Sequence, residues 1–181
     1  KVLIDSDTLK TLEIRQVNAG LCEAIKMSLT SDKELFSIIE NSTDLINDID
    51  TIIEKSLLIK KNVVEIDPKE KGLRKVLNFG HTIGHAIESY MDGKLLHGEC
   101  VALGMLPLCS QSVKARLIKI LEKYSLNNSV NIDTDILISY ITHDKKSSGT
   151  KITTIFVNEI GSFEMREMEI ENMREYINGG I

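Results

Sequence analysis

Three of the chain's four histidines lie between residues 81 and 97. His81 and His85 stand four positions apart on a segment with helical periodicity, a spacing used by two-histidine metal sites. His97 follows a short connection that contains a glycine, and it opens a second apolar segment. Imidazoles and one carboxylate could hold a divalent ion with a position open for substrate, as catalytic zinc usually is. These residues predict a metal site.

The carboxylate that would complete such a site has four candidates in the sequence: Glu23, Glu70, Glu88 and Glu99. Glu23 is the most unusual of them, because its neighbours are small and apolar and predict burial. A buried carboxylate must be paired or bound to a metal. The residues alone leave open which of the histidines bind the ion and which carboxylate joins them.

A polar stripe accompanies the first two histidines. If residues 74–85 form one helix, Arg74, Asn78, His81 and His85 fall within a stripe roughly 60° wide. The guanidinium fork of Arg74 suits a phosphate or a carboxylate, although a solvated face explains the individual lysines around it. We therefore expect this helix to form the wall of a site that binds an anion.

The elements that must position these residues are mostly helices. The apolar pattern predicts them at about residues 16–29, 32–41, 49–66, 98–107, 112–124, 134–143 and 171–177. Ser31 with Glu34 predicts a capping box for the second helix. Minor β-structure is expected at both ends, as a strand at residues 1–5 and a hairpin near 151–168. Gly80 and Gly84 predict a close approach of another backbone or a ligand.

The length, net charge, cysteines and apolar runs of the sequence argue against several classes of function. The 181 residues are enough for one sizeable core, and a net charge of −5 argues against a general nucleic-acid role. Three cysteines in apolar runs, none in a CxxC motif, predict buried reduced thiols and a cytoplasmic protein. The longest apolar run, Cys100 to Cys109, is about half a membrane span, so no membrane partner is expected. Because residues 1–5 read as the end of a strand, we expect the chain to be part of a longer protein.

Four motifs in order resemble the 3-dehydroquinate synthases. The central one is LRKVLNFGHTIGHAIE followed by LLHGECVALGM. AGLCEAIK and the opening VLIDSDTLKTL lie upstream, and DKKSSGTKITTIFVNEIG lies downstream. The resemblance covers nearly all of the chain. Glu13 departs from it, since proline is common there, and Cys22 and Cys100 replace small residues.

The resemblance implies the helical C-terminal half of a two-domain enzyme whose other half is an NAD-binding α/β domain. Residues 1–18 would be the end of an interdomain strand and a linker, and residues 19–181 the metal- and substrate-binding domain. The implied ligands of Zn²⁺ or Co²⁺ are Glu23, His81 and His97. The implied substrate and catalytic residues are Lys26, Lys60, Glu70, Arg74, Asn78 and His85, with Lys145 or Lys146 on the phosphate. Contacts to NAD are implied for Thr11, Leu12 and Gln16.

The implied reaction converts 3-deoxy-D-arabino-heptulosonate 7-phosphate to 3-dehydroquinate and phosphate, in a homodimer. Transient oxidation by NAD acidifies the carbon next to the new ketone, which permits phosphate to leave before the hydride returns and the ring closes. One alternative is another sugar-phosphate cyclase of this fold, and a more distant one is a metal-dependent glycerol-type dehydrogenase. A third is a metal-binding domain without catalysis, which we expect of residues 1–181 alone because they contain no GxGxxG loop for NAD.

Overall fold

The structure, a computed structural model, describes residues 3–144 and 149–178. Its elements are η1 (Ser6–Thr11), α1 (Ile14–Ser31), α2 (Lys33–Asn41), α3 (Leu45–Ile66), η2 (Leu73–Asn78), α4 (His81–Met91), α5 (His97–Met105), η3 (Leu106–Leu108), α6 (Gln111–Lys123), α7 (Thr134–Asp144), β1 (Lys151–Phe156), β2 (Glu164–Glu169), η4 (Ile170–Met173) and α8 (Arg174–Ile177), where η marks 3₁₀ turns. The mainly helical fold with a minor hairpin is thus confirmed. No described helix is long and apolar enough to cross a membrane.

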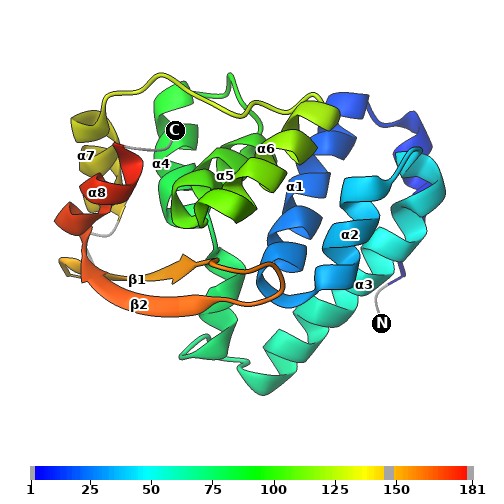
Figure 1. The fold of residues 1–181 in the computed structure, drawn as a ribbon, viewed down its shortest axis with the longest axis horizontal. Coiled ribbons are helices and arrows are strands. Elements are labelled where there is room, and N and C mark those ends of the chain that lie inside the picture. Colours follow the sequence, from blue (N-terminus) through cyan, green and yellow to red (C-terminus); the bar gives the residue numbers. More distant parts are fainter. Residues whose placement is uncertain (1–2, 145–148, 179–181) are drawn as a thin grey trace.

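Helix α5 lies at the centre of the molecule. In Figure 1, α1, α2 and α3 stand at one end and α7 and α8 at the other, with α4, α5 and α6 between them. Every residue of α5 after His97 is buried. Helices α1 and α4 both pack on it. Because α5 has no solvent face beyond its first residue, His97 is the point at which this central helix meets the surface.

Glycines allow this packing. A Cβ atom on Gly98 would lie 1.9 Å from the carbonyl oxygen of Ala19 in α1, far inside van der Waals contact. On the α4 side, a Cβ on Gly84 would lie 2.9 Å from the Cα atom of Val101. The close backbone approach predicted for Gly84 is therefore confirmed. Together, the contacts at Gly84 and Gly98 bring the first turns of α4 and α5 next to α1.

The continuous helix predicted for residues 74–85 is wrong. Residues 73–78 form the 3₁₀ turn η2, and α4 begins only at His81. Gly80 separates the two with a left-handed backbone, at φ 76°. Helical periodicity could not reveal this break, because apolar residues lie on the buried side of both segments. The polar stripe is therefore built from two elements rather than one.

Two local predictions at the N-terminal side are also corrected. Of the strand predicted at residues 1–5, the described part, residues 3–5, is not in a strand, and the Asp5 carboxylate instead accepts from the backbone N–H of Asp7 to start η1. Lys1 and Val2 lie outside the described residues. The cap of α2 is Asp32 rather than Ser31, because its carboxylate accepts from the N–H groups of both Glu34 and Leu35.

The hairpin predicted near residues 151–168 is confirmed. Strands β1 and β2 pair antiparallel, with Lys151 opposite Glu169 and Phe156 opposite Glu164. The side chain of Lys75 in η2 donates to the hydroxyl of Thr153 in β1 at 3.1 Å. This bond ties the hairpin to the segment that precedes the histidines.

Candidate functional site

Three histidines and one glutamate from three helices meet in space. The ring centroids of His81, His85 and His97 lie 5.4–5.6 Å apart. Each ring contributes one nitrogen to a group of three nitrogens that lie within 4.8 Å of one another. Glu23 of α1 faces two of them. Its Oε1 atom lies 3.7 Å from Nε2 of His81 and 3.9 Å from Nε2 of His97. The structure thus brings together residues that are far apart in the sequence.

The Glu23 carboxylate is held by Lys26 one turn further along α1. Lys26 Nζ lies 2.6 Å from Glu23 Oε2 and donates to the carbonyl oxygen of Leu77, also at 2.6 Å. Burial raises the pKa of Glu23, but the charge and hydrogen bond of Lys26 outweigh it and hold the pKa below its usual value. Burial, aided by the Lys26 ammonium, lowers the pKa of His81 to about 4. At neutral pH the site therefore holds a carboxylate beside a neutral imidazole, the protonation states that ligate metals.

The other candidate carboxylates have partners of their own. Glu70 accepts from the amide of Asn78 at 2.6 Å, Glu88 meets Nδ1 of His97 at 2.9 Å, and Glu99 is bound by Arg15. Oε1 of Glu23 instead is buried and has no hydrogen-bond partner among the residues that the structure describes. An orphaned carboxylate oxygen that points at two imidazole nitrogens fits a divalent cation.

A polar cleft of about 380 Å³ opens beside these histidines. Glu70, Asn78, His81 and His85 all line it, so four of the residues singled out from the sequence share one cavity. Glu70 has φ 55°, a left-handed conformation that is uncommon for a residue with a side chain. Part of the predicted polar wall therefore exists despite the break at Gly80.

The basic side chains predicted to bind the substrate do not line this cleft in the described part of the chain, Lys26, Lys60 and Arg74 included. Arg74 donates to the carbonyl oxygen of Pro68 at 3.0 Å and lies 3.8 Å from Glu70. Lys60 is exposed on α3, close enough for its charge to contribute to the lowered pKa of Lys26, of which burial is the main cause. Lys145 and Lys146 lie outside the described residues.

Six residues that line the cleft were not predicted as site residues from the sequence: Lys75, Thr82, Lys151, Ile152, Thr153 and Glu167. The last four come from the hairpin. The hairpin itself was predicted, but which side of it would face the histidines depends on tertiary packing. The only signal in the sequence was the place of Lys75 in the basic cluster before His81.

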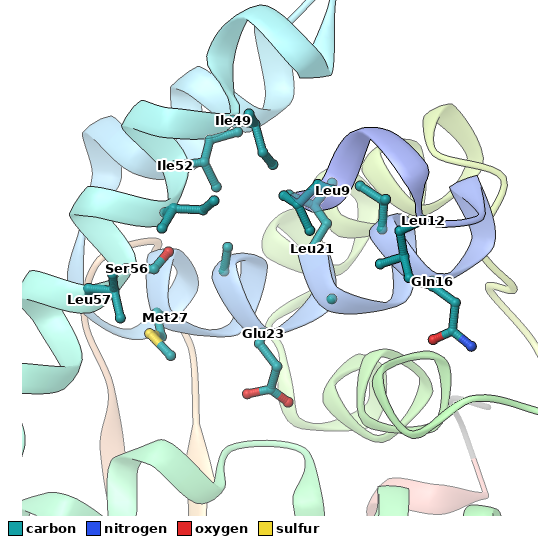
Figure 2. A pocket seen from close by; sticks show the side chains of 14 residues that line it. Leu9, Leu12, Gln16, Leu21, Glu23, Met27, Ile49, Ile52, Ser56 and Leu57 are labelled. Atoms are coloured by element: carbon teal, nitrogen blue, oxygen red, sulfur yellow. The ribbon is translucent and has the colours of Figure 1, made fainter. Parts of the chain in front are cut away.

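An apolar pocket of about 320 Å³ lies on the other side of Glu23, between η1, α1 and α3. Leu12 and Gln16 line it, two of the residues implied for NAD. Figure 2 shows that the Glu23 carboxylate points away from the apolar side chains of Ile49 and Ile52. Thr11 closes η1, where its hydroxyl donates to the carbonyl oxygen of Thr8 at 3.3 Å.

An ion pair between the exposed Arg15 and the buried Glu99 fixes the start of α5 against α1. Arg15 donates to both oxygens of Glu99, at 2.9 and 2.7 Å, and to the carbonyl oxygen of Lys94. Glu99 also accepts from the N–H of Leu96, the residue before His97. Burial raises the pKa of Glu99, but the hydrogen bonds from Arg15 and Leu96 hold it below its usual value. The pair thus anchors the turn that presents His97.

Arg15→Gln is expected to lower the urea midpoint of unfolding at neutral pH, because Glu99 would stay buried without its guanidinium partner. Since folding lowers the pKa of Glu99, its contribution to stability is complete above the ordinary carboxyl value of 4.5 and is lost as the pH falls through the folded-state pKa. The deficit of the variant should therefore shrink below pH 4.5. Lys61→Gln, which removes an exposed contact with Glu65 at 3.9 Å, is the control. Equal behaviour of the two variants would contradict an anchoring role.

The family description "3-dehydroquinate synthase C-terminal" matches residues 20–147, which include all four residues of the histidine and glutamate cluster. The chain belongs to this family. Its relatives include the 3-dehydroquinate synthases of Lactococcus lactis subsp. cremoris, 40% identical over 97% of the chain, and of Dictyoglomus thermophilum, 43% identical over 96%. The chain spans about half the length of these relatives, 54% and 52% respectively.

Two solved structures share the fold of this chain. A 2-epi-5-epi-valiolone synthase from Streptomyces hygroscopicus, with NAD⁺ and Zn²⁺ bound, matches 98% of the chain with a TM-score of 0.85 at 21% identity. The chain covers 54% of that protein. A 2-deoxy-scyllo-inosose synthase, in complex with carbaglucose-6-phosphate, NAD⁺ and Co²⁺, matches 98% with a TM-score of 0.75 at 24% identity, and 56% of it is covered.

Proposed function

We propose that the chain supplies the metal- and substrate-binding half of a 3-dehydroquinate synthase. The reaction would convert 3-deoxy-D-arabino-heptulosonate 7-phosphate to 3-dehydroquinate and phosphate, with NAD and a divalent metal. One observation carries the proposal: Oε1 of Glu23 is buried, has no hydrogen-bond partner in the described part of the chain, and faces Nε2 of His81 and of His97. The family match and relatives near 40% identity point to the same activity.

Glu23, His81 and His97 would hold the metal, Zn²⁺ or Co²⁺. One carboxylate and two imidazoles leave coordination positions open, as catalytic sites require. When bound, the ion would polarise a substrate hydroxyl as a Lewis acid and orient it. Lys26 stabilises the ligand Glu23, because its ammonium forms an ion pair with Oε2 of Glu23 and keeps the carboxylate ionised.

The cleft would receive the substrate beside this ion. His85 lines the cleft next to His81, and we assign it to proton transfer. Asn78 and Glu70, which are hydrogen-bonded to each other, would bind substrate hydroxyls. A substrate with a phosphate and a carboxylate needs cations, and the candidates are Lys26, Lys60, Arg74 and the pair Lys145 and Lys146. Positioning by these groups would keep the intermediate in place between steps.

The nicotinamide cofactor would approach from the opposite side of Glu23. Leu12 and Gln16 line the apolar pocket there, and Glu23 lies at its edge (Figure 2). An apolar wall suits the face of a planar ring, and the amide of Gln16 can hydrogen-bond to polar groups of the cofactor. Thr11, at the end of η1, would contribute its hydroxyl. The NAD contacts and the homodimer remain predictions, which cofactor titration and light scattering would test.

A product assay tests the proposed activity. The protein that carries this chain, supplied with NAD and Zn²⁺, is expected to release phosphate from 3-deoxy-D-arabino-heptulosonate 7-phosphate and to form 3-dehydroquinate without net NADH. Glucose 6-phosphate and sedoheptulose 7-phosphate serve as rival substrates, because other cyclases share the fold. Turnover of either rival in preference to the heptulosonate would contradict the proposal, and net NADH would point to a dehydrogenase.

A further inference from the structure

The histidines of the cluster differ in what their second ring nitrogen meets. Nδ1 of His97 lies 2.9 Å from Oε2 of Glu88, and Nδ1 of His81 lies 3.2 Å from the carbonyl oxygen of Phe79. For His85, neither nitrogen has a hydrogen-bond partner within the described ranges. The two rings with a partner at Nδ1 are the same two whose Nε2 atoms face Glu23.

We propose that Glu88 is a positioning residue for His97, which fixes the tautomer and orientation in which this ring meets the metal. The proposal rests on the metal site proposed above. A carboxylate can only accept a hydrogen bond, so the proton of neutral His97 must lie on Nδ1. Nε2 then carries a lone pair, and it points at Oε1 of Glu23, 3.9 Å away.

The same logic holds for His81, since the Phe79 carbonyl oxygen is also an acceptor. Two imidazole lone pairs and one carboxylate oxygen therefore converge, with no proton available between them. Such a group of acceptors repels itself unless a cation lies among them. Glu88 thus contributes to the site by determining which nitrogen of His97 is the lone-pair donor.

The positions of Glu88 and His97 explain how Glu88 can orient the His97 ring. Glu88 lies seven residues after His81 on α4 and therefore on the same face of that helix. The side chain of His97 is 46% exposed, whereas that of His81 is 16% exposed. The His81 ring is mostly buried, whereas nearly half of the His97 side chain is exposed, and the rings of His81 and His85 contact it on its inner side. The hydrogen bond to Glu88 therefore adds a directional restraint on the rotation of the His97 ring.

Metal titration of the purified chain tests this role. Removal of such an outer hydrogen-bond partner typically weakens metal binding by about 10–100-fold, and we expect Glu88→Ala to show a loss in this range. The readouts are the visible absorption of Co²⁺ and competition for Zn²⁺ with a chelator. Glu88→Gln should recover most of the affinity, because its amide oxygen can accept the same Nδ1–H. Glu65→Ala, which removes an exposed acid of α3, should bind as the parent does.

A second readout needs no metal. In the metal-free parent, long-range ¹H–¹⁵N correlation of the histidines should show His97 protonated at Nδ1, and Glu88→Ala should shift it towards the Nε2–H form. Parental affinity or an unchanged tautomer in Glu88→Ala would overturn the proposal. If the parent bound no Co²⁺ or Zn²⁺, the proposed metal site would be wrong, and the tautomer would still decide the role of Glu88. If Glu88→Ala did not fold, Glu88→Gln would decide by the same tautomer, since it should retain Nδ1–H.

Discussion

Glu23→Gln is expected to abolish tight binding of Zn²⁺ and Co²⁺ while the helical fold persists. The carboxylate is the only charged member of the proposed ligand set, and its Oε1 atom faces both His81 and His97. Glutamine has nearly the same shape but no charge, and its amide group can place donors towards the metal position. The loss of affinity should exceed the roughly 100-fold that removal of an outer hydrogen-bond partner can cause. Zinc content after dialysis and Co²⁺ titration measure it.

Two control variants make this result specific. Lys26→Met removes the ion pair with Glu23 but leaves the carboxylate, so it should still bind the metal and thereby separate lost coordination from a disturbed α1. His85→Ala addresses the competing set, since the three histidines alone could also hold an ion. If His85→Ala lost the metal and Glu23→Gln retained it, the ion would belong to the histidines, and our ligand set would be wrong.

The sequence predicts those features of the site that depend on neighbouring residues in the chain, and it does not predict those that depend on contacts between helices. The spacing of His81 and His85 and the nearby His97 made all three histidines candidates, and only the family resemblance singled out His81 and His97. The structure places each of these two at the first position of a helix. Glu23 was singled out because apolar neighbours predicted burial, yet only the packing of α1 on α5 brings it to the histidines. Which nitrogen of His97 is available depends on Glu88, and helical spacing gives no information on ring orientation. Local pattern therefore predicts the candidates, and tertiary contact selects among them.

The errors have the same origin. The predicted helix through residues 74–85 assumed that periodicity continues, whereas the left-handed backbone of Gly80 starts a new element. A glycine costs a helix only about 1 kcal/mol, so its presence alone did not forbid a continuous helix. What decides the matter is the contact with α5, where a Cβ on Gly80 would lie 2.8 Å from the carbonyl oxygen of Val101. That contact involves a residue 21 positions away, beyond the reach of any local pattern.

Gly98→Ala is expected to destabilise the protein strongly. The new methyl group would lie 1.9 Å from the carbonyl oxygen of Ala19 and 2.7 Å from its carbonyl carbon, so α5 would have to move away from α1. Overpacking of this kind costs about 3 kcal/mol when rigid backbone rather than a side chain must give way. The free energy of unfolding from urea titration measures it. Because Gly98 follows His97 and Ala19 precedes Glu23 by one helical turn, the same movement should also weaken Co²⁺ binding.

Gly20→Ala provides the matched comparison, since it adds the same methyl group to the helix that Gly98 touches. Within residues 3–144 and 149–178, a Cβ at Gly20 would meet nothing within 4 Å, and its helical position favours alanine. This variant should gain about 0.5–1 kcal/mol in stability. If Gly98→Ala were as stable as Gly20→Ala, α1 and α5 could separate at little cost, and their close contact would not be what holds Glu23 opposite His97. The expected result is a lower free energy of unfolding in Gly98→Ala and a higher one in Gly20→Ala, with metal affinity lost only in Gly98→Ala. This result would establish that Gly98 sets the spacing between the Glu23 carboxylate and the His97 imidazole.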